Sequence, residues 1–228
     1  MTRIGLLQCD HVDERFRPIA GDHVDMFGAL LPTVDLVPYA VCDGTLPASP
    51  DECDGWLATG SRRSVYDDEP WIHALAGFVG DVREAGAPYA GICFGHQLLA
   101  HALGGRVARA AIGWGAGAHD MEVRDREPHT VTLLYMHQDQ VTDVPDGGTV
   151  LGSTDHCPVA MLRVGSSMLG MQAHPEYPAA YIEALLDARA ARIGEEKVAA
   201  ARASLARPLD AAVAAAWITD VLGGRASA

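Results

Sequence analysis

The first hundred residues alternate between short continuous apolar runs and stretches whose apolar positions have helical spacing. Arg3–Cys9 is such a run, Pro18–Leu31 has helical spacing, and Val34–Ala40 is again strand-like and rich in branched residues. Further elements are expected as a strand over Gly55–Ala58, a helix over Pro70–Ala85, a strand over Tyr89–Cys93 and a helix over His96–Leu103. This alternation predicts βαβ units and therefore a parallel sheet.

After Gly104-Gly105 the pattern changes to short strand-like runs that are separated by turn residues. The runs are His119–Arg124, Thr130–Met136, Thr149–Ser153, Val159–Val164 and Met168–Ala173. Because short connections join antiparallel neighbours, this part is expected to be antiparallel and to extend or flank the parallel sheet.

The alanine-rich C-terminal region has helical spacing over Tyr181–Ile193, Glu195–Ala206 and Asp210–Leu222, with breaks at Gly194 and Pro208. We therefore predict an α/β fold, with an open, twisted, mostly parallel sheet, flanking helices, an antiparallel extension and C-terminal helices. One domain is expected over residues 1–228, with its core at about 3–193 and a helical extension over 194–228.

Composition narrows the class of protein. The 228 residues are 49% hydrophobic, enough for one sizeable core, and the net charge of −13 argues against nucleic acid or an anionic membrane as the main partner. No stretch reaches the about 18 apolar residues of a membrane span, and Met1–Gly5 does not have a signal-peptide layout, which predicts a cytoplasmic protein. The five widely spaced cysteines indicate reduced thiols, and no metal site or cofactor is expected.

The sequence Gly91-Ile92-Cys93-Phe94-Gly95 is typical of a tight turn between a strand and a helix. In such an elbow the central residue has a strained backbone, and the flanking residues must be small so that the two elements can approach. The first helical amides and the helix dipole would favour a thiolate at Cys93. Cys93 is therefore a candidate nucleophile, although an isolated cysteine near glycine is often only a small core residue.

The loop Thr59–Asp68 follows a predicted parallel strand, and ligands bind at that end of open α/β sheets. The amide of Gly60 or Ser61 is a candidate oxyanion donor beside the amide of Phe94. Taken alone, the loop is better interpreted as an ordinary turn between a strand and a helix.

A second chemical landmark is His174-Pro175-Glu176, which follows the strand predicted to end at Ala173. A cysteine nucleophile needs an imidazole to move its proton, and the imidazole needs a carboxylate to orient it. The tripeptide alone is a weak signal, since it would also suit a surface turn. Together with Cys93, each just past a predicted strand, it predicts a Cys93–His174–Glu176 triad.

Three ordered motifs, Gly91–Gln97, Met136–Val141 and His174–Glu176, resemble the class I glutamine amidotransferases, the triad family. The similarity extends over roughly Arg3–Tyr177. The resemblance implies a flavodoxin-like amidase domain that binds a small molecule, glutamine or another γ-glutamyl compound. Cys93 would then attack the side-chain amide, forming a γ-glutamyl thioester that water hydrolyses.

The resemblance also implies substrate contacts. Gln97 would contact the bound glutamine, and the main chain of Met136, His137 and Gln138 would hold its α-amino and α-carboxyl groups. His137 is equally well interpreted as a buried structural histidine, and His96 is interpreted as a structural contact.

The loop Thr59–Asp68 departs from the Pro-Gly-Pro-rich oxyanion loop of amidotransferase subunits that serve a separate synthase. It is more similar to the loop of stand-alone, GMP-synthase-like members and of γ-glutamyl peptidases. Three interpretations follow. The favoured one is a glutamine amidase, with or without a synthase partner that accepts the ammonia. The second is a γ-glutamyl peptide or conjugate hydrolase, whose larger leaving group would need an open site near Arg62, Arg63 and Tyr66. The third is a non-catalytic binding or regulatory subunit.

Overall fold

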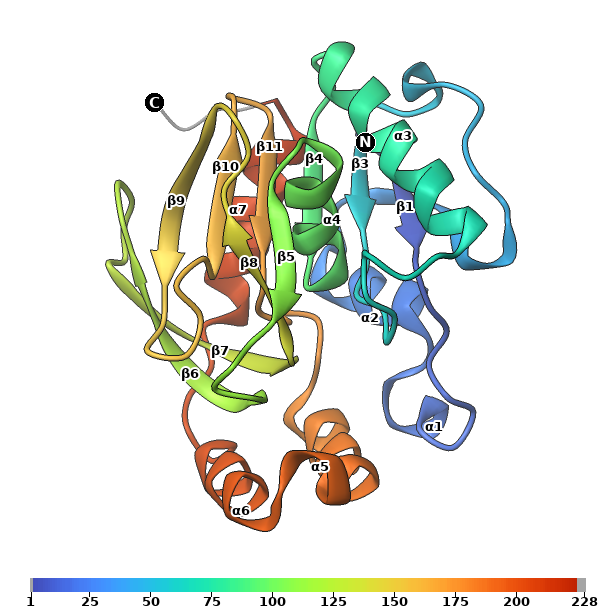
Figure 1. The fold of residues 1–228 in the computed structure, drawn as a ribbon. Coiled ribbons are helices and arrows are strands. Elements are labelled where there is room, and N and C mark those ends of the chain that lie inside the picture. The colour runs from blue at the N-terminus through green and yellow to red at the C-terminus, as the bar shows by residue number, and fades with distance from the viewer. Residues whose placement is uncertain (1, 225–228) are drawn as a thin grey trace.

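The computed structural model describes residues 2–224 and contains one nine-stranded sheet (Figure 1). Counted in spatial order from one edge, the first five strands are parallel to their neighbours, and every neighbouring pair after the fifth strand is antiparallel. In spatial order the strands are β2 (Asp35–Ala40), β1 (Arg3–Gln8), β3 (Gly55–Ala58), β4 (Tyr89–Ile92), β11 (Met168–Met171), β10 (Met161–Val164), β9 (Gly148–Ser153), β6 (Gly115–Val123) and β7 (Thr130–His137).

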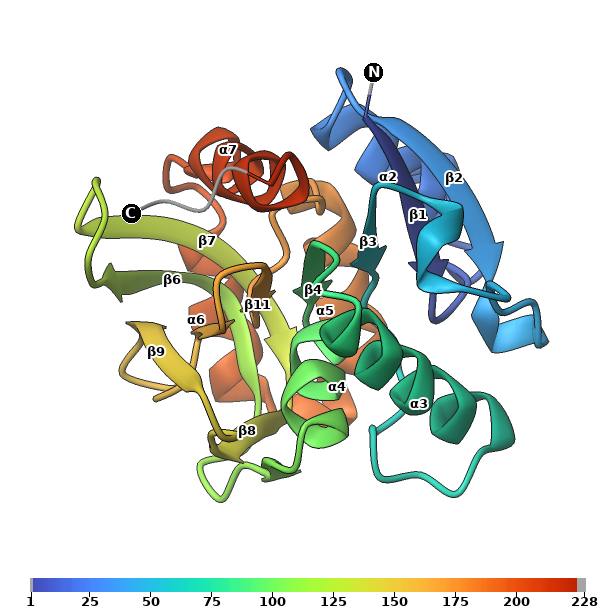
Figure 2. The ribbon, with the colours of Figure 1, turned by 90° about the horizontal axis from the view of Figure 1, so that it is seen from above.

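Helices cover both faces of the sheet (Figure 2). On one face lie α2 (His23–Leu30) and α7 (Ala211–Leu222), and on the other lie α3 (Pro70–Glu84) and α4 (Phe94–Ala102). Each face has its own apolar cluster, because the buried parallel strands are apolar on both sides. The prediction of an open α/β sheet with an antiparallel extension is confirmed.

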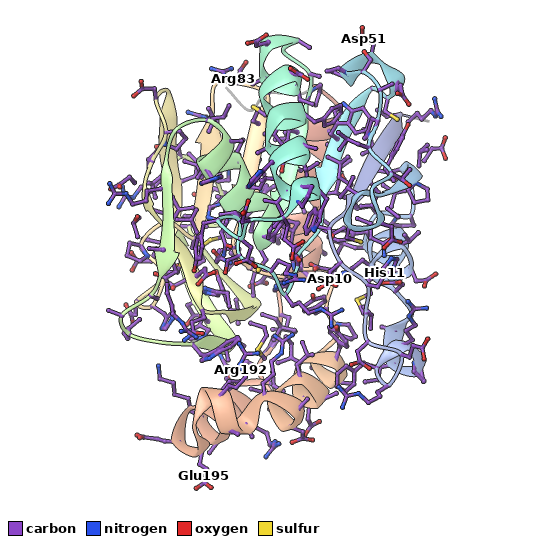
Figure 3. All side chains as sticks on the ribbon, turned by 45° about the vertical axis from the view of Figure 1, so that its right-hand side comes forward. Asp10, His11, Asp51, Arg83, Arg192 and Glu195 are labelled. Atoms are coloured by element: carbon purple, nitrogen blue, oxygen red, sulfur yellow. The ribbon has the colours of Figure 1, made fainter. Side chains whose placement is uncertain are left out.

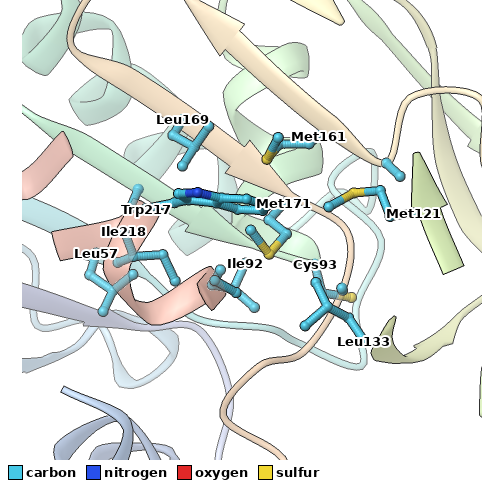
Figure 4. Close-up of a cluster of buried hydrophobic side chains, with 14 of the residues drawn as sticks. Leu57, Ile92, Cys93, Met121, Leu133, Met161, Leu169, Met171, Trp217 and Ile218 are labelled. Atoms are coloured by element: carbon cyan, nitrogen blue, oxygen red, sulfur yellow. The ribbon is translucent and has the colours of Figure 1, made fainter. Parts of the chain in front are cut away.

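The last helix, α7, packs into the core of the sheet. Trp217 and Ile218 belong to the same apolar cluster as Leu57 and Leu169 (Figure 4). The apolar core therefore includes side chains beyond residue 193. Residues 225–228 of the predicted C-terminal extension lie outside the described residues.

The helices α5 (Ala179–Ile193) and α6 (Glu195–Ser204) lie below the carboxyl ends of the parallel strands (Figure 1). α6 packs on β6, whereas α5 faces the edge at which the candidate functional residues follow their strands. Among the helices in the described part of the chain, none is long and apolar enough to span a membrane.

One local prediction is wrong, and one small sheet was not predicted. The helix expected over Pro18–Leu31 is two helices, α1 (Arg17–Ala20) and α2, because Gly21 turns the chain at φ 78° and Asp22 then caps α2. A small antiparallel sheet of β5 (Arg106–Arg109) and β8 (Asp139–Asp143) was not expected, since neither segment has an apolar run and only their mutual pairing defines them.

Candidate active site

Cys93 occupies a strained elbow between β4 and α4. Its backbone angles are φ 51° and ψ −98°, a region that residues other than glycine rarely adopt and that is typical of functional sites. A Cβ on Gly91 would lie 2.3 Å from the carbonyl oxygen of Gly95, and a Cβ on Gly95 would lie 2.6 Å from the carbonyl oxygen of Ala58. Both glycines are therefore required sterically, as the sequence predicted. Cys93 itself lies at the border of the apolar cluster (Figure 4).

His174 is held in one orientation by three contacts. Its Nδ1 lies 2.8 Å from Oε1 of Glu176, its backbone amide donates to the carbonyl of Leu134, and its ring stacks on Tyr177 with centroids 4.0 Å apart. Both the imidazole and the Glu176 carboxylate are buried. Because Nδ1 faces the carboxylate, Nε2 is the nitrogen left for proton exchange with Cys93.

The charge balance at His174 favours the protonated imidazole. Burial by itself lowers the pKa of His174, but the negative charges of Glu176 and of Cys93, with hydrogen bonds to both, raise it to about 10. A carboxylate buried against the ring thus keeps a proton available beside the sulfur.

The loop after β3 passes directly over this pair. A Cβ on Gly60 would lie 2.9 Å from Cε1 of His174 and 3.7 Å from Cβ of Cys93. Within residues 2–224, the amides of Gly60, Ser61 and Phe94 have no hydrogen-bond acceptor. The structure therefore places all three predicted oxyanion donors at the same site, and their role stays a prediction.

A chain of amide hydrogen bonds ends at the sulfur of Cys93. Gln97 donates to the carbonyl of Asp139 over 2.8 Å and to Oε1 of Gln172 over 3.0 Å. Gln172 in turn donates to Sγ of Cys93 over 3.4 Å. Gln97, expected to contact substrate, thus supports Gln172, a residue that the sequence analysis missed. The available signal was its position, directly after β11 and two residues before His174.

Replacing Gln172 by leucine should slow alkylation of Cys93 by iodoacetamide at pH 7 about 2- to 10-fold, because a hydrogen-bond donor to the thiolate is lost. Gln140→Leu is the matched control. Gln140 is also a buried amide and donates to the carbonyl of His156, but it does not contact Cys93. Equal alkylation rates in both variants would contradict the assignment of Gln172 as a hydrogen-bond donor to the Cys93 thiolate.

The segment Met136, His137 and Gln138 lines a cavity of about 300 Å³ that also contains Cys93 and Gln97. His137 is buried, and its Nδ1 lies 3.1 Å from the carbonyl of Asp139. Burial lowers the pKa of His137 to about 3. The ring is therefore neutral and holds the turn into β8, which agrees with the structural interpretation of this histidine.

Buried neutral histidines should make the fold sensitive to acid. Burial lowers the pKa of His96 to about 4, that of His137 to about 3, and also that of His23. Since the unfolded chain then binds more protons below about pH 6.5, the free energy of unfolding should fall there by up to about 1.4 kcal/mol per group and pH unit. The raised pKa of His174 acts oppositely, adding stability that is complete below about pH 6.5 and lost as the pH rises toward 10.

Urea unfolding at pH 7, 6 and 5 measures this slope. His96→Gln should make it shallower, because one of the groups that takes up a proton on unfolding is gone. An unchanged slope in that variant would contradict the assignment of His96 as a neutral buried ring.

A thiol on a strained elbow and an imidazole paired with a carboxylate, both at the carboxyl edge of parallel strands, mark an α/β protein with a candidate triad site. Residues 34–181, more than half of the chain, match the family model described as glutamine amidotransferase class-I. The chain therefore belongs to the class I glutamine amidotransferase family.

Two curated relatives illustrate the range of this family. Gamma-glutamyl peptidase 5 of Arabidopsis thaliana is 31% identical over 152 residues, which are 61% of this chain and 61% of the relative. A GMP synthase (glutamine-hydrolyzing) of Neisseria meningitidis is 34% identical over 131 residues, which are 54% of this chain and 24% of the synthase. The chain thus spans about three fifths of the peptidase and about a quarter of the synthase.

Solved structures share the fold over almost the whole chain. A glutamine amidotransferase from Thermotoga maritima superposes with a TM-score of 0.75 at 18% identity, covering 98% of this chain and 97% of the other. One from Methylobacillus flagellatus superposes with a TM-score of 0.73 at 20% identity, covering 98% and 92%.

Proposed function

We propose that this protein hydrolyses γ-glutamyl amides, with Cys93 as nucleophile, His174 as proton carrier and Glu176 as the group that orients the imidazole. The observation that carries the proposal is the strained Cys93 backbone beside an imidazole whose Nδ1 is held 2.8 Å from a buried carboxylate. Membership of the class I amidotransferase family supports the same chemistry.

The reaction proceeds in two halves. With the proton of Cys93 already on His174, the thiolate Sγ bonds to the γ-glutamyl carbonyl carbon, and the oxygen that becomes negative is held by the amides of Gly60 or Ser61 and of Phe94. The C–N bond then breaks as His174 gives its proton to the leaving nitrogen. Water next gives a proton to His174 and adds to the thioester, the C–S bond breaks, and the Cys93 thiolate and the protonated His174 are restored. Glutamate leaves after its new γ-carboxyl group has lost its proton to solvent.

Glutamine is the simplest substrate of this reaction, and ammonia is its leaving group. A γ-glutamyl peptide or conjugate is the second candidate, favoured by a cavity of about 270 Å³ that contains both Cys93 and His174. The relatives named as gamma-glutamyl peptidases support this candidate as well. A cytoplasmic location and an acceptor enzyme that uses released ammonia stay predictions.

The test is steady-state release of glutamate from glutamine and from small γ-glutamyl peptides, with Cys93→Ala as the blank. Turnover of glutamine above the blank supports the amidase, and a preference for peptides supports the hydrolase. If no compound is turned over, the third interpretation, a non-catalytic subunit, replaces both.

A further inference from the structure

Two cavities meet at Cys93, and the chemistry gives each of them a role. The one of about 300 Å³ contains Gln97 and the segment Met136–Asp139, which suits the glutamyl part of a substrate. The one of about 270 Å³ contains His174, which must protonate the leaving nitrogen. The leaving group therefore enters the cavity on the His174 side.

The wall of the leaving-group cavity is larger than ammonia requires. Phe16, Tyr177, Tyr181 and Leu185 form an apolar side of this cavity, and Phe16 and Tyr181 pack edge to face. Such a wall accommodates a carbon-containing leaving group, and it is continuous with the charged residues of α5.

Arginines gather around both cavities, in a chain whose net charge is −13. Four of them already have an oxygen partner within the protein. In three pairs the partner is a carboxylate that balances the charge of the arginine, and in the fourth it is an amide oxygen that accepts a hydrogen bond from the guanidinium. These pairs are Arg15 with Asp13, Arg62 with Asp10, Arg63 with Glu69, and Arg109 with the side-chain oxygen of Gln138. The second interpretation of the sequence placed the leaving group near Arg62 and Arg63. Both of these side chains are already paired with a carboxylate of the protein.

Arg189 and Arg192 differ from these four. They lie one turn apart on α5, so they share a helix face, and both guanidinium groups stand over the ring of Trp114, at 5.9 and 5.5 Å from its centroid. Neither guanidinium group forms an ion pair or a side-chain hydrogen bond with any residue in the range 2–224. Both line the cavities beside Cys93, and Arg192 lies between α5 and the sheet (Figure 3).

We propose that Arg189 and Arg192 bind a carboxylate on the leaving group, so that the preferred substrates are γ-glutamyl amides of amino acids rather than glutamine. This inference rests on the proposed hydrolysis. Two planar guanidiniums held by an aromatic face and free of protein carboxylates are preorganised for a carboxylate. The acids of the same cavity, Asp10 and Asp13, are already paired with Arg62 and Arg15 and do not repel it.

The test compares kcat/KM for γ-glutamylglycine and γ-glutamylglycinamide, which differ only in the carboxylate of the leaving group, with glutamine as a third substrate. The wild-type protein should prefer γ-glutamylglycine about 10- to 100-fold, the range expected for hydrogen bonds to a charged group. The double variant Arg189→Met, Arg192→Met should lose that preference. The double lysine variant should keep part of it, because the charge remains without the bidentate geometry.

Arg124→Met is the matched control, since Arg124 is an exposed arginine outside both cavities, and it should keep the wild-type preference. Turnover without a carboxylate preference in the wild-type protein would overturn this inference and leave the proposed hydrolysis standing. An equal loss on all three compounds in the double methionine variant would also overturn it, because the arginines would then serve the shared glutamyl part. No turnover of any compound by the wild-type protein would overturn the hydrolysis, and the inference with it.

Discussion

Replacing Cys93 by serine is expected to lower kcat/KM for γ-glutamyl substrates by at least about 1000-fold. A hydroxyl at this position is almost un-ionised at neutral pH, whereas the thiol ionises readily beside the His174 imidazole. The backbone of the elbow does not depend on the sulfur, because the steric requirement lies at Gly91 and Gly95. The variant should therefore fold and bind substrate while failing in the chemical step.

The measurement is glutamate release together with labelling by a glutamine-like chloroketone, which should disappear in the serine variant. Cys42→Ser is the control, because burial and the charge of Asp43 raise the pKa of Cys42 to about 11 and it lines neither cavity at Cys93. Activity near that of the wild type in Cys93→Ser would exclude Cys93 as the nucleophile.

Gly91→Ala should lower the free energy of unfolding by about 3 kcal/mol or more. The added Cβ would lie 2.3 Å from the carbonyl oxygen of Gly95, and that atom belongs to the first turn of α4, which is itself pressed against Ala58. A backbone contact of this kind is not relieved by a rotamer change, so β4 and α4 would have to separate.

Gly77→Ala is the matched control. Gly77 lies inside α3, is exposed, and its added Cβ would meet no atom within 4 Å. Alanine should stabilise that helix by about 0.5 to 1 kcal/mol. Urea unfolding of both variants measures the contrast, and a Gly91→Ala protein as stable as the wild type would disprove the steric account of the elbow.

The predicted triad illustrates what can be deduced from local sequence. Cys93, His174 and Glu176 each follow a strand, and β4 and β11 are parallel neighbours, so their following residues emerge at one sheet edge. Strand periodicity and two glycines were sufficient to place each residue after a strand, because both act within a few residues. The parallel pairing of β11 with β4, which brings the two strand ends together, was not predicted, since Met168–Ala173 was assigned to the antiparallel part.

Other parts of the site depend on contacts between distant segments. Gln172 and Gln97 are 75 residues apart, and nothing in either local pattern indicates that their amides meet. The position of Arg189 beside Cys93 was not predicted, because the sequence does not show that α5 lies over the sheet edge. The same limit explains why the pairing of β5 with β8 was missed.

The sequence by itself determined the alternation of strands and helices in the parallel half, the elbow at Cys93 and the residue types of the predicted triad, since apolar periodicity and glycine sterics are local properties of the chain. The tertiary structure decided which amides support the sulfur, which arginines are already paired, and where α5 stands relative to Cys93. Those features depend on how separate elements pack and on which charges neutralise one another, and both are settled only when the whole sheet and its helices are assembled.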